Sequence, residues 1–219
     1  FELAPDTLAL LRRMVQDGEV AALVPERVWQ ELARGLMETR PGRMLDVLKD
    51  SGAWPQVLPG LRPDSALWAR VDRSAGADAP LPVRYACLAC DAPALGEHLR
   101  APTDARDLAV MLGRERGTLA AAAGRPDDLI ALFDRCDAWR RPERFLELLQ
   151  AAACLGDPTM DARVAQAVAH SLAQAQAVDL AAVSREAVAQ GLRGPAIGQR
   201  VREARKAALV AAASRQAGA

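Results

Sequence analysis

Apolar residues recur every three or four positions along almost the whole chain, and no stretch shows the period-two alternation typical of a half-buried strand. Near the start, Leu8, Leu11 and Val15 lie on one such stripe, which ends at Asp17-Gly18. The pattern predicts helices at about 6–17, 25–38, 44–49, 83–89, 103–112, 127–133, 142–152, 161–176, 184–191 and 195–219. We therefore expect an all-α protein, built as an elongated array of helical bundles.

The sequence changes character between Pro55 and Pro82. Five prolines, at 55, 59, 63, 80 and 82, and the run from Ser74 to Asp78 predict loops around one short helix near Leu67. With 219 residues the chain is long enough for one large or two small domains. This segment is the predicted boundary between subdomains.

Composition narrows the class of protein. Hydrophobic residues make up 51% of the chain and charged residues 26%, which favours a globular fold over disorder. No apolar run approaches the roughly 20 residues that span a bilayer, and no N-terminal signal pattern is present. Four cysteines do not form a disulfide framework in a chain of this size, which suits a reducing compartment. These features predict a soluble, cytoplasmic protein with no membrane partner.

Any binding of nucleic acid must come from a local patch, because Lys plus Arg and Asp plus Glu both number 28. From Ser184 onward, seven basic residues stand against two glutamates, so this segment carries a net charge of about +5. The seven are Arg185, Arg193, Arg200, Arg202, Arg205, Lys206 and Arg215. The last segment of the chain is therefore the predicted RNA-binding region.

Within this basic segment, two glycines flank an arginine in Gly191-Leu192-Arg193-Gly194, just before Pro195. Exposed amides beside a cation at a helix start suit a backbone phosphate. The alternative is a tight connection whose glycines only adopt left-handed backbone geometry. The RNA-binding residues that we predict are Arg193, Gly194, Arg200, Arg202, Arg205 and Lys206.

Motifs for catalysis or metal binding are weak. His98 and His170 are the only histidines, and neither lies in a nucleophile motif. Cys87, Cys90 and His98 could begin a zinc site, but no second cysteine pair completes it, and the simpler interpretation is two small apolar residues one helical turn apart. No Walker loop is present. We predict neither catalytic nor metal-binding residues in this chain.

Two polar clusters remain. On the second predicted helix, Arg27 and Glu31 lie one turn apart, beside Glu26 and Trp29, and can pair, although most such pairs are solvated surface bridges. The other cluster, at the junction of two predicted helices, is either an RNA contact or, as we favour, a structural knot of salt bridges. Its members are Asp134, Asp137, Trp139, Arg140, Arg141 and Arg144.

Several segments, taken together, resemble the non-catalytic half of the class II bacterial CCA-adding tRNA nucleotidyltransferases, which share ancestry with bacterial poly(A) polymerase. These segments are 1–36, 84–91, 101–112, 129–149 and 188–209. The run Pro-Glu-Arg-Val-Trp-Gln-Glu-Leu at 25–32 looks like the family's fifth conserved motif, in the helical neck. The segment from Leu132 to Arg140 favours the CCA enzyme over the polymerase.

The resemblance implies what each part does. In the family, a catalytic head with a Gly-Ser motif, a DxD pair for two magnesium ions and an EDxxR element for CTP or ATP should precede residue 1, and none of these motifs occurs here. Magnesium, CTP and ATP would thus serve the full-length enzyme, whereas this chain alone would hold no cofactor and transfer no nucleotide. Glu26, Arg27 and Glu31 would brace the absent head.

The chain departs from the family in the HD phosphohydrolase module that many members carry. Where His-Asp is expected the sequence reads Cys90-Asp91, followed by Ala92-Pro93, and the preceding histidine-bearing segment is shortened to residues 55–82. The hydrolase chemistry needs histidines and aspartates around a metal. The resemblance thus implies a degenerate HD-like body without phosphohydrolase activity.

The predicted organisation is a helical neck (1–54), a shortened Pro/Gly-rich connection (55–82), a degenerate HD-like body (83–156) and a basic helical tail (157–219). Its predicted partners are tRNA and the catalytic head of the same polypeptide, with no DNA partner. Because the chain opens at Phe1, we expect it to be a piece of a longer protein. The alternative is a free-standing helical protein-interaction module descended from such an enzyme.

Overall fold

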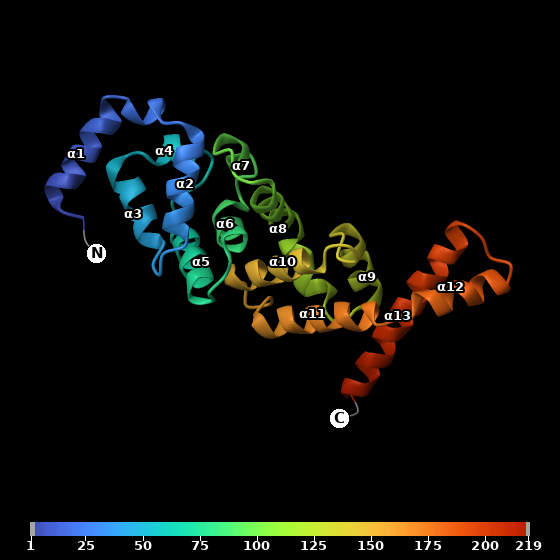
Figure 1. Ribbon diagram of the computed structural model, residues 1–219. Helices are drawn as coiled ribbons and strands as arrows, with labels where there is room; N and C mark the ends of the chain where they lie inside the picture. Colours follow the sequence, from blue (N-terminus) through green and yellow to red (C-terminus); the bar gives the residue numbers. More distant parts are fainter. Residues whose placement is uncertain (1–2, 218–219) are drawn as a thin grey trace. The chain divides into compact units, whose positions relative to one another are not determined.

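The computed structural model describes residues 3–217, and over this range the chain is helical with no strand, which confirms the all-α prediction (Figure 1). The helices are α1 (Pro5–Gln16), the 3₁₀ helix η1 (Glu19–Ala22), α2 (Pro25–Leu36), α3 (Gly42–Ser51), α4 (Trp54–Val57), α5 (Ser65–Gly76), α6 (Leu81–Ala89), α7 (Leu95–His98), α8 (Thr103–Ala122), α9 (Pro126–Arg135), α10 (Pro142–Cys154), α11 (Ala162–Gln176), α12 (Leu180–Ala189) and α13 (Pro195–Ala217). Among the described residues, no helix is both long and apolar enough to cross a bilayer.

The chain divides into two compact units. Residues 1–116 and 150–161 form the N-terminal unit, and residues 117–149 and 162–219 form the C-terminal unit. The division falls inside α8 and α10, so neither unit is one continuous stretch of sequence. The four-part division predicted from the sequence stays a prediction.

The prediction of loops between residues 55 and 82 was partly wrong. The segment holds most of α4 and the whole of α5, so Ser74 lies inside a helix. Asp64 caps α5 by accepting a hydrogen bond from the Leu67 amide at 2.8 Å. The Ser74 hydroxyl is fully buried and donates to the Val71 carbonyl at 2.6 Å. This polar side chain is therefore satisfied within the helix, although the sequence had indicated a loop.

Helix α8 continues ten residues beyond its predicted end at Leu112. Gly113, directly after the predicted end, lies inside the helix and serves its packing. A Cβ on Gly113 would lie 2.5 Å from the carbonyl oxygen of Cys90, so only glycine allows this close approach. The helix predicted to begin at Ser184 begins at Leu180, where Asp179 caps it by accepting a hydrogen bond from the Ala182 amide at 2.9 Å.

The core of the N-terminal unit centres on α6, where every residue from Val83 to Ala89 is buried. The Tyr85 ring meets the Trp29 ring of α2 edge to face, with centroids 5.1 Å apart. Arg84, 4% exposed, donates to the carbonyls of Leu36 at 2.9 Å and Glu38 at 3.0 Å. The buried guanidinium thus closes the open carbonyls at the end of α2.

The core of the C-terminal unit is built around Phe133 of α9. Its ring makes edge-to-face contacts with Trp139, at 5.4 Å between centroids, and with Phe145, at 5.3 Å. Helices α9 and α11 both pack against α13, which buries Leu209 and Ala212. Helix α13 is therefore part of this unit's core as well as the carrier of its basic residues.

Candidate nucleic-acid interface

The basic residues of α13 are largely engaged within the C-terminal unit. Arg202 forms an ion pair with Asp134 of α9. The Lys206 Nζ lies 2.6 Å from an oxygen of Asp127, at the start of the same helix. Both cationic side chains remain 44% exposed. Three or four residues separate successive contacts along α13, so one face of the helix lies against the acidic side chains of α9.

Trp139, in the turn between α9 and α10, is held on several sides. Its indole nitrogen donates to Asp134 at 2.6 Å, and the Arg205 guanidinium carbon lies 3.7 Å from the ring centroid. Burial lowers the pKa of Arg205, because it disfavours the charged form. Asp134 therefore serves both Trp139 and Arg202. A cluster of polar contacts forms here, as favoured from the sequence. The arginines described in it, Arg202 and Arg205, belong to α13, 63 or more residues further along the chain.

The remaining predicted RNA-binding residues have fewer contacts with the rest of the unit. Arg200 pairs with Glu203, one turn on, at 3.2 Å. Arg193 and Gly194 are exposed, and among the described residues Arg193 has no ion-pair partner. Gly191 and Gly194 adopt positive φ of 82° and 53°, as a tight connection requires, and a Cβ at either would meet nothing within 4 Å. The connection is open to solvent on the side of its glycines.

Two further cations are exposed beside the knot. Arg140 and Arg141 follow Trp139, and the structure gives neither of them an ion pair among the residues it describes. Their backbone amides donate to the carbonyl of Asp137, which holds the unusual left-handed φ of 51°. Together with Arg193 and Arg185, which is also exposed and has no ion pair among the described residues, these two arginines are the cations of the C-terminal unit most available to a phosphate.

The neck residues do not form the expected pair. Glu31 pairs with Arg34 at 2.8 Å, and not with Arg27, while Glu26 pairs with Arg100. The pKa of Glu26 is lowered by a hydrogen bond to its own backbone and then by Arg100. The Glu31 and Arg34 side chains are 64% and 75% exposed, so this is a solvated surface bridge.

Arg27 and Glu31 instead line the mouth of an apolar groove of about 300 Å³ in the N-terminal unit. Its other walls are Leu23, Val28, Leu32, Met44, Leu48 and Val57. Leu23 is 49% exposed. Apart from Arg27 and Glu31, the groove is lined by apolar side chains. Among the described residues Arg27 has no ion-pair partner. Trp29, on the same helix, is buried, 9% exposed, and contributes to the core.

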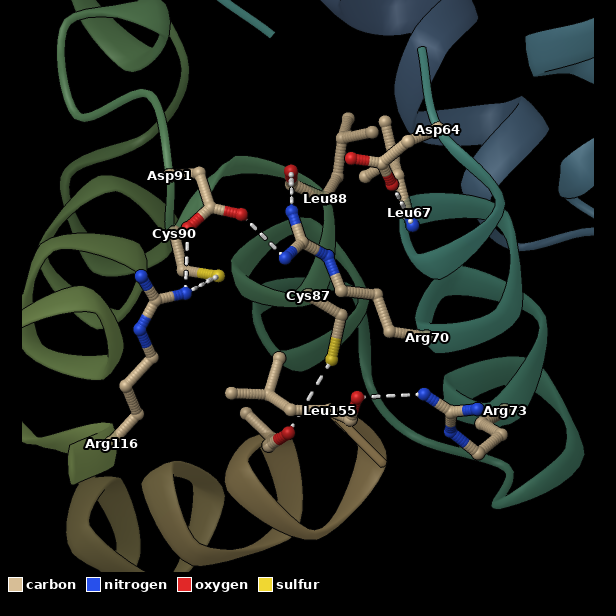
Figure 2. A network of polar contacts seen from close by, with 11 residues as sticks. Asp64, Leu67, Arg70, Arg73, Cys87, Leu88, Cys90, Asp91, Arg116 and Leu155 are labelled. Carbon is tan, nitrogen blue, oxygen red and sulfur yellow. Dashed lines mark hydrogen bonds and ion pairs between the residues drawn. The ribbon is translucent and has the colours of Figure 1, made fainter. Parts of the chain in front are cut away.

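Asp91, the aspartate of the altered His-Asp position, is held by two arginines (Figure 2). Arg70 donates to one carboxylate oxygen at 2.5 Å and Arg116 to the other at 2.6 Å. Arg70 also donates to the Leu88 carbonyl at 3.3 Å. Burial alone would raise the pKa of Asp91, but hydrogen bonds from Arg70 and Arg116 outweigh it and lower that pKa. The carboxylate therefore ties α5 and α8 to the end of α6.

The possible zinc ligands have other partners. His98 shares a hydrogen bond of 2.9 Å with the Gln56 carbonyl, and the Cys87 thiol donates to the Ala151 carbonyl at 3.6 Å. Over residues 3–217, no group of three or more histidines, cysteines and acids is placed to hold a metal ion. In this structure, His98 and Cys87 therefore contact backbone carbonyls of the fold.

Comparison with known families gives one match, at the start of the chain. Residues 1–64 match a family described as the probable RNA and SrmB-binding site of polymerase A. No solved structure matches the chain.

Curated relatives are similar over nearly the whole chain. The Multifunctional CCA protein of Leptothrix cholodnii is 42% identical over 94% of this chain and 60% of that protein. The CCA-adding enzyme of Bordetella pertussis is 45% identical over 95% of this chain and 56% of that enzyme. The Multifunctional CCA protein of Aromatoleum aromaticum is 42% identical over 96% and 62%. The chain therefore spans about 60% of the length of these relatives.

Proposed function

We propose that this chain, which is similar to CCA-adding enzymes over nearly its whole length, is the tRNA-binding neck, body and tail of a CCA-adding tRNA nucleotidyltransferase. The similarity to these enzymes, 45% identity over 95% of the chain in one case, is the observation that carries the proposal. Magnesium, CTP and ATP act in the catalytic head of the same polypeptide, which works in the cytoplasm. The four segments keep the limits 1–54, 55–82, 83–156 and 157–219.

The proposed tRNA surface has two parts. In the tail, Arg193 and Gly194 make the first contacts, since they are exposed and free of acidic partners. Arg200, Arg202, Arg205 and Lys206 join them by exchanging carboxylate or aromatic partners for phosphates. The tail then positions the tRNA without reading its sequence, because phosphates carry no sequence information.

The second part of the tRNA surface lies in the neck. The matched family is described as an RNA-binding site, and residues 1–64 carry exposed arginines. Arg13, Arg27 and Arg40 are exposed, with no ion pair among the described residues. We extend the RNA surface predicted from the sequence to these three residues.

The absence of phosphohydrolase activity is supported by the lengths of the alignments. The alignments with the two Multifunctional CCA proteins span 256 and 257 residues, more than this chain has, so they contain gaps in this chain. The alignment with the Bordetella enzyme spans only 212. In addition, both carboxylate oxygens of Asp91 already accept hydrogen bonds from guanidinium groups, those of Arg70 and Arg116.

Binding and transfer assays test the proposal. The 219-residue chain, mixed with tRNA that lacks CCA, should shift the tRNA in a native gel, yet should incorporate no labelled CTP or ATP in the presence of magnesium. A chain without affinity for tRNA would support the alternative, a helical protein-interaction module that uses the apolar groove beside Arg27.

A third experiment tests the neck residues Glu26, Arg27 and Glu31 as a brace for the head. In the full-length enzyme, Glu31→Ala should lower turnover more than tRNA affinity, because misplacement of reacting groups by about 1 Å can cost about a hundredfold. The matched control is Arg34→Ala, which breaks the same ion pair. Equal turnover in both variants would indicate that Glu31 acts only as a partner in a surface ion pair.

A further inference from the structure

Two adjacent arginines in the turn between α9 and α10 are left outside the polar contacts around Trp139 (Figure 1). Arg140 and Arg141 are exposed, and among the described residues neither side chain has a hydrogen bond or an ion pair. Asp134 is not free to neutralise them, because its two oxygens serve Trp139 and Arg202. Like charges held close together repel, and an anion between them removes the repulsion.

The turn that carries the two arginines is held by backbone hydrogen bonds. The Asp137 carbonyl accepts from the amides of Arg140, at 3.2 Å, and Arg141, at 3.0 Å. The Ala138 amide donates to the Phe133 carbonyl at 2.9 Å. Asp137 itself has a left-handed φ of 51°, a conformation that persists in a residue other than glycine only where its surroundings impose it. The backbone is thus fixed without the help of the arginine side chains.

Trp139, directly before the arginine pair, anchors the turn to the core of the C-terminal unit. Its ring meets the Phe133 ring edge to face, with centroids 5.4 Å apart, and its indole nitrogen donates to Asp134 at 2.6 Å. The guanidinium carbon of Arg205, on α13, lies 3.7 Å from the centroid of the same ring. A backbone that is ordered before binding lowers the entropy lost when a ligand is bound. Two exposed cations therefore stand on a prepared support.

We propose that Arg140 and Arg141 form a phosphate-binding site that holds neighbouring phosphates of one RNA strand. The proposal rests on the proposed function, because tRNA supplies the phosphates. A planar guanidinium matches a phosphate through two parallel N–H···O bonds. On α13, Arg202 and Lys206 have to leave their carboxylates before they bind a phosphate, whereas no carboxylate has to be displaced at the arginine pair.

A glutamate beside the pair gives the site a second, opposite signature. Glu143 lies in the first turn of α10, is exposed, and has no ion pair among the described residues. Its negative charge repels a phosphate bound at Arg140 and Arg141. Glu143→Gln, which keeps the shape of the side chain, should therefore tighten tRNA binding by about two- to fivefold, the size expected for one exposed charge.

Salt titration of tRNA binding by the 219-residue chain tests the site. The variant Arg140→Ala, Arg141→Ala should bind weaker by on the order of tenfold at about 0.1 M salt, and its slope of log affinity against log salt should be flatter by about 2. The matched control is Arg125→Ala, Arg163→Ala, which removes two exposed arginines of the same unit that are engaged with other groups. The control should keep the slope.

Fluorescence anisotropy with labelled tRNA measures each affinity, and circular dichroism checks the fold. Arg140→Gln, Arg141→Gln, which keeps most of each side-chain stem, replaces the alanine variant if that chain does not fold. A folded variant that keeps its slope while the natural chain binds tRNA would overturn the site and leave the proposed function standing. Equal losses in the control pair, or unchanged or weaker binding by Glu143→Gln, would also overturn it. A natural chain without affinity for tRNA would overturn the proposed function and the site with it.

Discussion

Two buried arginines of the N-terminal unit, Arg70 and Arg84, and the cations of α13 in the C-terminal unit each add one positive charge but differ in availability. In the N-terminal unit, Arg70 and Arg84 are only 8% and 4% exposed, and their guanidinium groups bond Asp91 and backbone carbonyls. On α13, Arg202 and Lys206 are 44% exposed and pair with surface carboxylates. Net charge therefore overstates what a segment offers to RNA, and the partner of each cation has to be known.

The two settings should also differ in energy. A buried guanidinium that loses its carboxylate is left uncompensated, which costs about 3–5 kcal/mol when both groups are buried. An exposed pair is worth about 0–1 kcal/mol, because water and salt screen it. The Asp91 side chain is 40% exposed and the Arg70 side chain 10%. The energy of this ion pair therefore lies between those of exposed and buried pairs, but nearer the buried one.

The largest expected effect is on stability. We expect Asp91→Ala to lower the free energy of unfolding by about 2–4 kcal/mol, since Arg70 then keeps a buried charge without its carboxylate. Asp127→Ala, which removes the exposed partner of Lys206, should change it by less than about 1 kcal/mol. Urea unfolding followed by circular dichroism measures both. Equal losses in the two variants would remove the contrast between the two settings.

The clamp also predicts a dependence on pH. The pKa of Asp91 is lowered in the folded state, so its contribution to stability is present above its unfolded value of about 3.9 and is lost as pH falls through the lower folded value. The difference between the natural chain and Asp91→Asn should therefore be constant at neutral pH and shrink only below about pH 4. Urea unfolding at several pH values tests this, and a difference that shrinks near neutrality would contradict it.

A smaller effect concerns two glycines of α8. Gly113→Ala should destabilise by about 1–3 kcal/mol, because the added Cβ would meet the Cys90 carbonyl at 2.5 Å and force the helices apart. Gly117→Ala has nothing within 4 Å and should stabilise by about 0.5–1 kcal/mol through helix propensity. Thermal unfolding of the two variants gives the sign directly. Stabilisation by both would show that the close approach at Gly113 is absent.

These cases show which features a sequence alone can predict. Helix starts with local signals were predicted well, as at Pro25 and Pro142, since a proline in the first turn acts within a few residues. The continuation of α8 past Leu112 was missed, because the role of Gly113 depends on its close approach to Cys90, directly after α6. Local punctuation can be read from neighbouring residues, whereas a close helix contact cannot.

The candidate site follows the same division. The basic segment after Ser184 was found by counting charges, and the resemblance to a known family indicated its role. The contacts of Arg202 and Lys206 with α9 could not be found in this way, because each joins residues more than 65 positions apart. No local pattern tells which of several arginines on a helix will face an acidic neighbour.

A still smaller effect concerns RNA affinity. If Lys206 exchanges Asp127 for a phosphate, Asp127→Ala should tighten tRNA binding by up to about fivefold, the equivalent of an exposed pair worth at most about 1 kcal/mol. Arg193→Ala should weaken binding, since this residue has no acidic partner among the described residues. Fluorescence anisotropy with labelled tRNA measures both. Weaker binding by Asp127→Ala would show that α13 acts as part of the core alone.

The most direct test of the account is the salt dependence of tRNA binding by the whole chain. Each phosphate neutralised by Lys or Arg should contribute about −0.9 to the slope of log affinity against log salt on a duplex arm. We expect a linear decline, flattened by about 2–3 in the combined variant Arg193→Ala, Arg200→Ala, Lys206→Ala, with the helical signal in circular dichroism unchanged. A folded triple variant that keeps both the affinity and the slope of the natural chain would contradict the assignment of tRNA binding to the tail.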